Sequence, residues 1–307
     1  MRELRRDPTT GDWVALVPGR PLPRRERGVP LGAEGCPFCP GAEEHTGAEI
    51  SRRQGAGSWS VRVIPEQSPA LRPEVQAGRR GFGPYDQVAG VGAHEVIVES
   101  PEHRPLWDQP LTQSIAALEV AQARLRDLAR DGRFAHITWT RSAGGCCEHP
   151  RARVVAMPVV PRALSEAQAR AAEWLARTGR ELFQDLVDYE REDGRRVLLE
   201  EDGIIALCPW SSRVPFEVWV LPAEPGASFA GASQRLVGAA ARVLRWVEGR
   251  LAQELDGVSV QVQLWTEPLR SPGGRWHFRV LPALEQAEGG ISLNPVPPEE
   301  AARVLRR

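Results

Sequence analysis

The most informative segment of the sequence runs from Ser142 to Arg153 and reads Ser-Ala-Gly-Gly-Cys-Cys-Glu-His-Pro-Arg-Ala-Arg. Two apolar runs with strand-like composition flank it, at 136–140 and 154–160. We therefore expect a loop that connects two neighbouring strands. Everything else in the chain can be interpreted as a scaffold around this loop.

Four residues of this loop suit anion binding. Gly144 and Gly145 lack side chains, so a bound group can approach the backbone closely. Arg151 and Arg153 each present a rigid fork of hydrogen-bond donors that matches a carboxylate or a phosphate. The loop therefore predicts a site for an anionic ligand.

The segment from Ala143 to Arg153 resembles the signature of the galactose-1-phosphate uridylyltransferases, a branch of the histidine-triad superfamily, which reads Ala-Gly-Ala-Ser-Leu-Glu-His-Pro-His-Ser-Gln. In that family the second histidine is the nucleophile that takes the nucleotidyl group, and the glutamine helps to hold the phosphate. Here His149 matches the first histidine, whereas Arg151 stands at the nucleophile position and Arg153 at the glutamine position. The resemblance thus implies a divergent member whose nucleophilic histidine is replaced by arginine.

The resemblance continues in order along the chain, from residue 2 to residue 306. It includes the amino-terminal opening, the frame Arg-Val-x-Pro followed by Pro-Ala-Leu, the second-half motif Arg-x-Pro-Phe-Glu-x-Trp, and the carboxy-terminal loop and helix. These segments are 2–18, 62–71, 213–219 and 289–306.

Cys36-Pro37-Phe38-Cys39 predicts a metal site, because two thiolates three positions apart can grip one zinc ion from a tight turn. A Cys-x-x-Cys pair alone could equally be a redox pair. The resemblance supplies the other two ligands, since His103 and His149 match the structural zinc ligands of the family. His94 and His45 lie nearby, but His94 opens a strand-like run and His45 lies in a polar loop, so we expect packing for the first and solvent exposure for the second.

Several positions depart from the family pattern around the nucleotide. Glu66 replaces an asparagine and Ser68 replaces a stacking aromatic residue, while Thr138 and Thr140 stand where the family has asparagine and glycine. A carboxylate cannot donate as an amide does, and serine offers no ring. We therefore expect no uridine specificity of the usual kind.

The resemblance also suggests ligand contacts outside the loop. Arginines of the segment 20–27 match residues near the nucleotide phosphates, and Arg20 is the candidate that we retain, whereas Arg62 belongs to the strand that touches the nucleotide. His277 lies in a segment similar to the His-x-His-Ile-Glu strand, which contributes to a second metal site in some members. Arg275 and Arg279 occupy the flanking positions, and because arginine does not ligate cations we predict no second metal. His277 is a candidate substrate contact, although a hydrogen-bonded core histidine is the more ordinary role.

Composition limits the class of protein. The chain has 307 residues, 42% hydrophobic residues and a formal net charge of -1, which indicates a globular protein with no overall attraction to nucleic acid or membrane. All 39 Lys+Arg positions are arginine, so no lysine can act as a Schiff base or general base. Five cysteines, no leader and no apolar run of membrane length predict a cytoplasmic protein without a disulfide framework.

Helical periodicity is clear in three segments, Leu111 to Asp131, Ser165 to Arg191 and Gln234 to Leu255. The resemblance implies an α+β fold of two tandem histidine-triad-like domains, each an antiparallel half-barrel sheet with helices packed on one side, and the two packed face to face. We place the boundary near Ala163, which gives domains 1–163 and 164–307. A homodimer is also implied.

Three functions remain open at this level. The first is a protein that binds a nucleotide, nucleotide sugar or sugar phosphate without ping-pong uridylyl transfer, because Arg151 has no lone pair for attack on phosphorus. The second is an active nucleotidyltransferase of the kind that serves galactose metabolism, with Cys146 or Cys147 as the nucleophile. The third is a non-catalytic protein in which zinc stabilises a platform for a regulatory or structural partner.

Overall fold

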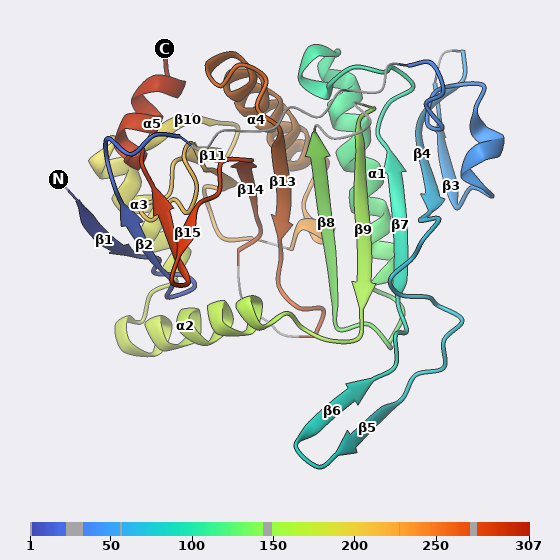
Figure 1. The fold of residues 1–307 in the computed structure, drawn as a ribbon, viewed down its shortest axis with the longest axis horizontal. Helices are drawn as coiled ribbons and strands as arrows, with labels where there is room; N and C mark the ends of the chain where they lie inside the picture. The colour runs from blue at the N-terminus through green and yellow to red at the C-terminus, as the bar shows by residue number, and fades with distance from the viewer. Residues whose placement is uncertain (1, 23–32, 56, 144–148, 227, 271–274) are drawn as a thin grey trace.

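The computed structural model describes residues 2–22, 33–55, 57–143, 149–226, 228–270 and 275–307. Their core is a ten-stranded sheet with helices packed against it, which confirms the α+β class (Figure 1). The strands, in spatial order, are β10 (Val197–Glu201), β11 (Ile204–Leu207), β12 (Val218–Pro222), β14 (His277–Pro282), β13 (Val260–Trp265), β8 (His136–Ala143), β9 (Arg151–Met157), β7 (Ala93–Val98), β4 (Trp59–Pro65) and β3 (Ser51–Gln54).

The two halves of the chain share this sheet. β8 from the first half pairs antiparallel with β13 from the second half, with Thr140 opposite Gln263 and Val260 opposite Ala143. The expected face-to-face packing of two separate sheets is therefore wrong, because the edge strands pair with each other and satisfy their backbone hydrogen bonds. The division at residue 163 stays a prediction.

Helices α1 (Leu111–Leu128) and α4 (Gln234–Glu254) pack against each other and cover one face of the sheet (Figure 1). Trp139, Val154 and Phe278 point from their strands to this face and pack in one core with Leu244 of α4. Both helices confirm the predicted periodic segments, although α1 ends at Leu128 rather than at Asp131.

The predicted helix from Ser165 to Arg191 is instead two helices. α2 (Arg162–Thr178) ends at Gly179, which adopts φ +73° as a left-handed cap. α3 (Leu182–Asp193) starts after Glu181, whose carboxylate accepts from the amides of Phe183 and Gln184. The apolar periodicity continues through the break, which is why the pattern alone suggested one helix.

The chain ends meet in a small sheet at one side of the molecule (Figure 1). β1 (Glu3–Arg6) and β2 (Trp13–Leu16) pair antiparallel, and β16 (Ile291–Asn294) adds in parallel to β2. The remaining elements are β5 (Arg79–Phe82), β6 (Tyr85–Val88), β15 (Ala287–Glu288), α5 (Pro298–Leu305) and the 3₁₀ turns Glu43–Thr46, Leu106–Asp108 and Phe229–Gly231. None of the helices in the described ranges combines the length and the apolarity that a bilayer crossing requires.

Candidate functional site

Four side chains from three distant segments meet in one cluster. The ligand atoms of Cys36, Cys39, His103 and His149 all lie within 4.8 Å of one another. Cys39 Sγ is 3.4 Å from His103 Nδ1 and 3.5 Å from His149 Nδ1. Two thiols and two imidazoles are the donor set of closed tetrahedral zinc sites, so the residues fit the group that the sequence predicted.

The surroundings of His149 orient it for this role. Its Nε2 lies 2.7 Å from the carbonyl oxygen of Ser100, which can only accept, so Nε2 carries the proton and the Nδ1 lone pair faces the cluster. Burial lowers the pKa of His149 to about 4, against the opposing effect of the Ser100 carbonyl. The imidazole is therefore neutral at physiological pH, as a metal ligand must be.

The loop that carries the two cysteines is anchored to β4. Trp59 Nε1 donates to Glu43 at 2.9 Å, and Arg62 donates to the Thr46 hydroxyl at 2.9 Å and to the Glu49 carboxylate. Arg62 is completely buried, with its guanidinium directed at these protein groups. A ligand contact for Arg62 stays a prediction, and its observed contacts hold the metal-cluster loop in place.

The two arginines of the signature lie on the sheet face opposite α1 and α4. In β9 the exposure alternates, and Ala152 and Val154 are core residues, so Arg151 and Arg153 point to the other face. The guanidinium carbon of Arg151 lies 5.4 Å from the ring centroid of Phe38, which places Arg151 beside the cysteine loop. The side chain of Arg153 is 49% exposed and is therefore accessible to a ligand.

Arg153 has a counter-ion in Glu66. Its Nε donates to Glu66 Oε2 at 3.3 Å, and the same oxygen lies 3.9 Å from His94 Nε2. His94 Nδ1 accepts from the amide of Ala70 at 3.2 Å, so the proton of the neutral ring is on Nε2. Burial raises the pKa of Glu66, but the hydrogen bond from Arg153 and the amide of Ser68 outweigh it and leave the pKa below its usual value.

Polar side chains continue from Arg153 across the same face. Thr140 is opposite Arg153, Gln263 is opposite Thr140, and Arg279 is opposite Gln263. Directly opposed residues of antiparallel strands point to one face. Sequence reasoning did not assign Gln263, and no local motif marks it, because its place in this row comes only from the β8–β13 pairing.

Arg279 and His277 lie in an aromatic pocket of the second half. The Arg279 guanidinium carbon is 3.7 Å from the Trp265 ring centroid and 4.8 Å from that of Trp219. Its Nε donates to His277 Nε2 at 3.1 Å, and His277 is only 3% exposed. Burial, followed by the charge of Arg279, lowers the pKa of His277 well below its usual value. His277 is thus a buried neutral histidine, and its role as a substrate contact stays a prediction.

Arg275 takes the place of a ligating residue in the segment that the sequence associated with a second metal. Its guanidinium donates to Glu181 at 3.0 Å, to Gln184 at 2.8 Å and to the carbonyl of Pro222 at 3.1 Å. The Arg275 guanidinium therefore contacts the acceptors of this region, and the expectation of no second metal stays a prediction.

Two other candidate residues from the sequence lie on the surface. Arg20 pairs with Glu288 at 2.7 Å on the surface, where it could meet a ligand. His45 is 66% exposed at its side chain, as expected. Gly144, Gly145, Cys146 and Cys147 lie outside the described residues, so their predicted roles stay predictions.

The chain is similar to known proteins over its whole length. No family model matches the chain. The ADP-glucose phosphorylase of Arabidopsis thaliana is 26% identical over 331 residues, which cover 99% of this chain and 92% of that protein. The galactose-1-phosphate uridylyltransferase of Thermotoga maritima is 24% identical over 328 residues, covering 100% of this chain and 98% of the relative. This chain is thus similar over nearly its whole length to proteins of the galactose-1-phosphate uridylyltransferase family.

Solved structures agree with the family at the level of the fold. A crystal structure of the Arabidopsis thaliana ADP-glucose phosphorylase with bound ADP-glucose superposes with a TM-score of 0.83, at 24% identity, and covers 100% of this chain and 98% of that one.

Proposed function

We propose that this protein binds a nucleotide sugar, or its nucleotide or sugar-phosphate part, on the open sheet face beside the metal cluster. The observation that carries the proposal is the position of Arg151 and the half-exposed Arg153 on that face. Guanidinium groups bind phosphate oxygens with charge-assisted hydrogen bonds. A relative with bound ADP-glucose supports the ligand class, so ADP-glucose and UDP-glucose are the first ligands to test.

The proposed activity excludes a covalent half-reaction through residue 151. Attack on phosphorus needs a lone pair, which an arginine side chain lacks at any physiological pH. What Arg151 and Arg153 can do is hold the phosphate and stabilise negative charge on it during a direct transfer to an acceptor. Among the described cysteines, Cys36 and Cys39 are in the metal cluster, and burial raises the pKa of the Cys208 thiol, so none of these three is suited to replace the nucleophile.

In this proposal a zinc ion is bound by Cys36, Cys39, His103 and His149 and acts as a structural element. With four protein ligands it has no open position for substrate. Its contribution is to fix the cysteine loop, and with it Phe38, next to Arg151.

Intact-protein mass spectrometry tests the covalent part. After incubation with UDP-glucose or ADP-glucose we expect no nucleotidyl adduct on this protein, whereas the Arg151→His variant regains the family nucleophile and should acquire one. An adduct on the unmodified protein would overturn the proposal, and peptide mapping would then show whether Cys146 or Cys147 carries it.

Isothermal titration calorimetry tests the binding part. We expect the Arg153→Gln variant to bind ADP about tenfold more weakly, which corresponds to the loss of one charge-assisted contact. Arg162→Gln is the matched control, because Arg162 is also exposed and paired with one glutamate, Glu166 at 2.6 Å, but lies on α2. If the protein bound none of the nucleotides and sugar phosphates tested, the hypothesis of a non-catalytic, zinc-stabilised platform would be favoured instead.

The family also supports three finer proposals, namely a homodimer, a cytoplasmic location and a role in carbohydrate metabolism. Size-exclusion chromatography with light scattering tests the first of these directly.

A further inference from the structure

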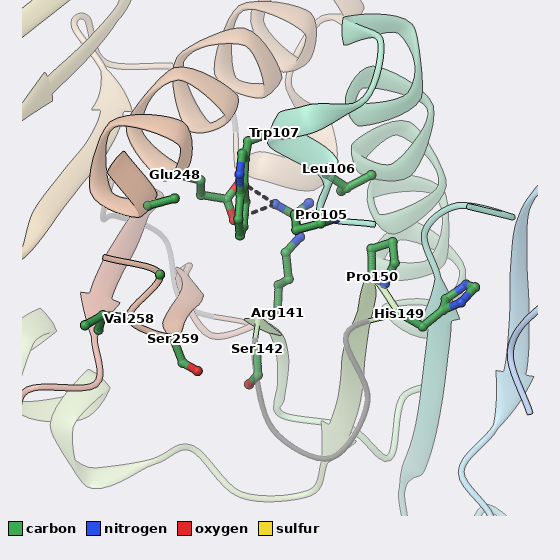
Figure 2. Close-up of a pocket in the computed structure, with 12 residues that line it drawn as sticks. Pro105, Leu106, Trp107, Arg141, Ser142, His149, Pro150, Glu248, Val258 and Ser259 are labelled. Carbon is green, nitrogen blue, oxygen red and sulfur yellow. Dashed lines mark hydrogen bonds and ion pairs between the residues drawn. The ribbon is translucent and has the colours of Figure 1, made fainter. Parts of the chain in front are cut away.

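A cavity lies on the sheet face that α1 and α4 cover, opposite to the face of Arg151 and Arg153, and its lining includes His149 and Pro150 (Figure 2). The volume of the cavity is about 190 Å³. One water needs only roughly 10–15 Å³ of such space, so the cavity has room for a small organic molecule. The lining includes Leu106, Trp107, Arg141, Glu248, Ala252 and Val258.

The floor of this cavity carries a buried charge cluster. Arg141 donates to both oxygens of Glu99, at 2.8 and 2.9 Å, and its Nη1 lies 3.2 Å from Glu248. Glu99 is fully buried, and Arg141 and Glu248 are 5% and 2% exposed. Two carboxylates and one guanidinium give the cluster a formal charge of -1 when all three are ionised.

Glu248 is the weakly satisfied member of the cluster. Arg141 forms its short, two-pronged contact with Glu99, whereas the same guanidinium reaches both oxygens of Glu248 with one nitrogen, at 3.2 and 3.3 Å. A carboxylate has roughly four lone-pair sites for hydrogen bonds. The Glu248 carboxylate, which lines the cavity, therefore has acceptor capacity that Arg141 does not use.

The rest of the lining suits the hydrocarbon part of a ligand. Leu106, Trp107, Ala252 and Val258 are apolar, and an indole face attracts a cation. The exposed residues Ser142 and Gly257 mark the opening to solvent. The lining thus combines a carboxylate with spare acceptors, an aromatic wall and an entrance.

We propose that this cavity is a binding site for a small organic cation, an alkylammonium ion whose charged group pairs with Glu248 and whose carbon chain lies against Trp107 and Val258. The cation would bring the charge of the cluster to zero. Because Glu248 lies in α4 and Trp107 lies in the first half of the chain, such a ligand would contact both halves.

Titration of n-butylammonium chloride, followed by ligand-observed NMR and calorimetry, tests the proposal at constant ionic strength. The neutral analogue is 1-butanol, which has the same number of heavy atoms. We expect saturable binding of the ammonium ion and at least tenfold weaker binding of the alcohol, because the ion pair contributes most of the affinity.

Two variants locate the site. Glu248→Gln removes the charge, and Ala252→Leu fills the cavity without changing any charge or disfavouring the helix; each should weaken n-butylammonium binding at least tenfold. Glu254→Gln, on the same helix and in an exposed pair with Arg250, should leave it unchanged. Circular dichroism verifies that each variant is folded. If Glu248→Gln does not fold, Ala252→Leu still tests the proposal.

Two results would overturn the proposal. One is equal affinity for the ammonium ion and the alcohol, which would make this an apolar or water-filled cavity. The other is binding that persists undiminished in a folded Ala252→Leu variant.

Discussion

The ion pair between Glu66 and Arg153 makes a quantitative prediction about phosphate binding. The Glu66 carboxylate lies 3.3 Å from Arg153 Nε. A phosphate that binds Arg153 must therefore displace Glu66 or share the guanidinium with it, and the carboxylate repels the incoming anion. Glu66→Gln removes that competitor and keeps the side-chain shape. We therefore expect phosphate and ADP to bind the variant more tightly.

The size of the effect follows from the exposure of the pair. The side chains are 49% and 19% exposed, so the pair itself contributes about 0.2–1 kcal/mol. Repulsion between a carboxylate and a phosphate about 7 Å apart adds on the order of 1 kcal/mol at an effective dielectric constant near 40. The sum after solvent screening is about 1 kcal/mol, which corresponds to about fivefold tighter binding.

Calorimetric titration of inorganic phosphate and ADP into both proteins measures this change. The gain should shrink at high salt, because screening weakens both contributions. It should also shrink in acid. The pKa of Glu66 is lowered in the folded protein, so the ion pair is intact above the ordinary glutamate pKa of about 4.3 and is lost as the pH falls through the lowered value.

Glu166→Gln is the matched control, since Glu166 also pairs with one exposed arginine but lies on α2. Equal or weaker phosphate binding by Glu66→Gln, with an unchanged control, would refute the reasoning. This result would mean that the ligand does not reach Arg153, or that the Glu66 carboxylate accepts hydrogen bonds from hydroxyl groups of the ligand.

Three further predictions concern the metal and two buried groups. Elemental analysis should find one zinc per chain, and Cys39→Ser should lose it together with several kcal/mol of unfolding free energy, whereas full stability without metal would exclude a structural zinc. Burial, opposed by Arg141, raises the pKa of Glu248. The stability that Glu248 contributes should therefore decrease as the pH rises from the ordinary glutamate pKa through the raised pKa. If urea titrations over this pH range gave Glu248→Gln the same dependence of unfolding free energy on pH, the prediction would be contradicted. Burial lowers the pKa of His136 to about 4, so stability should fall as the pH drops from about 6.5 toward 4, and His136→Asn should flatten that decline.

Local patterns predicted the parts of this protein that depend on nearby residues. The spacing of Cys36 and Cys39 indicated a metal-binding turn, and periodic apolar residues indicated α1 and α4. Likewise, alternation around Arg153 is a property of one strand. In each of these cases the interacting groups lie within a few positions of one another, so backbone geometry relates them directly.

Other features could not be obtained in this way. The break at Gly179 leaves the apolar periodicity intact, so the sequence suggested one helix where the chain forms two. The contact between Arg141 and Glu248 joins residues 107 positions apart, and the row from Arg153 to Arg279 depends on the register of several strands.

Residue identity and short spacing were sufficient to predict the resemblance to the family, the types of metal ligand and the arginine at the position that matches the family nucleophile. The fold was needed to show that the halves share one sheet, that Glu66 pairs with Arg153 and that Glu248 lines a cavity. Strand pairing and helix packing bring such distant groups together, and they are determined by the free energy of the whole fold rather than by any local segment.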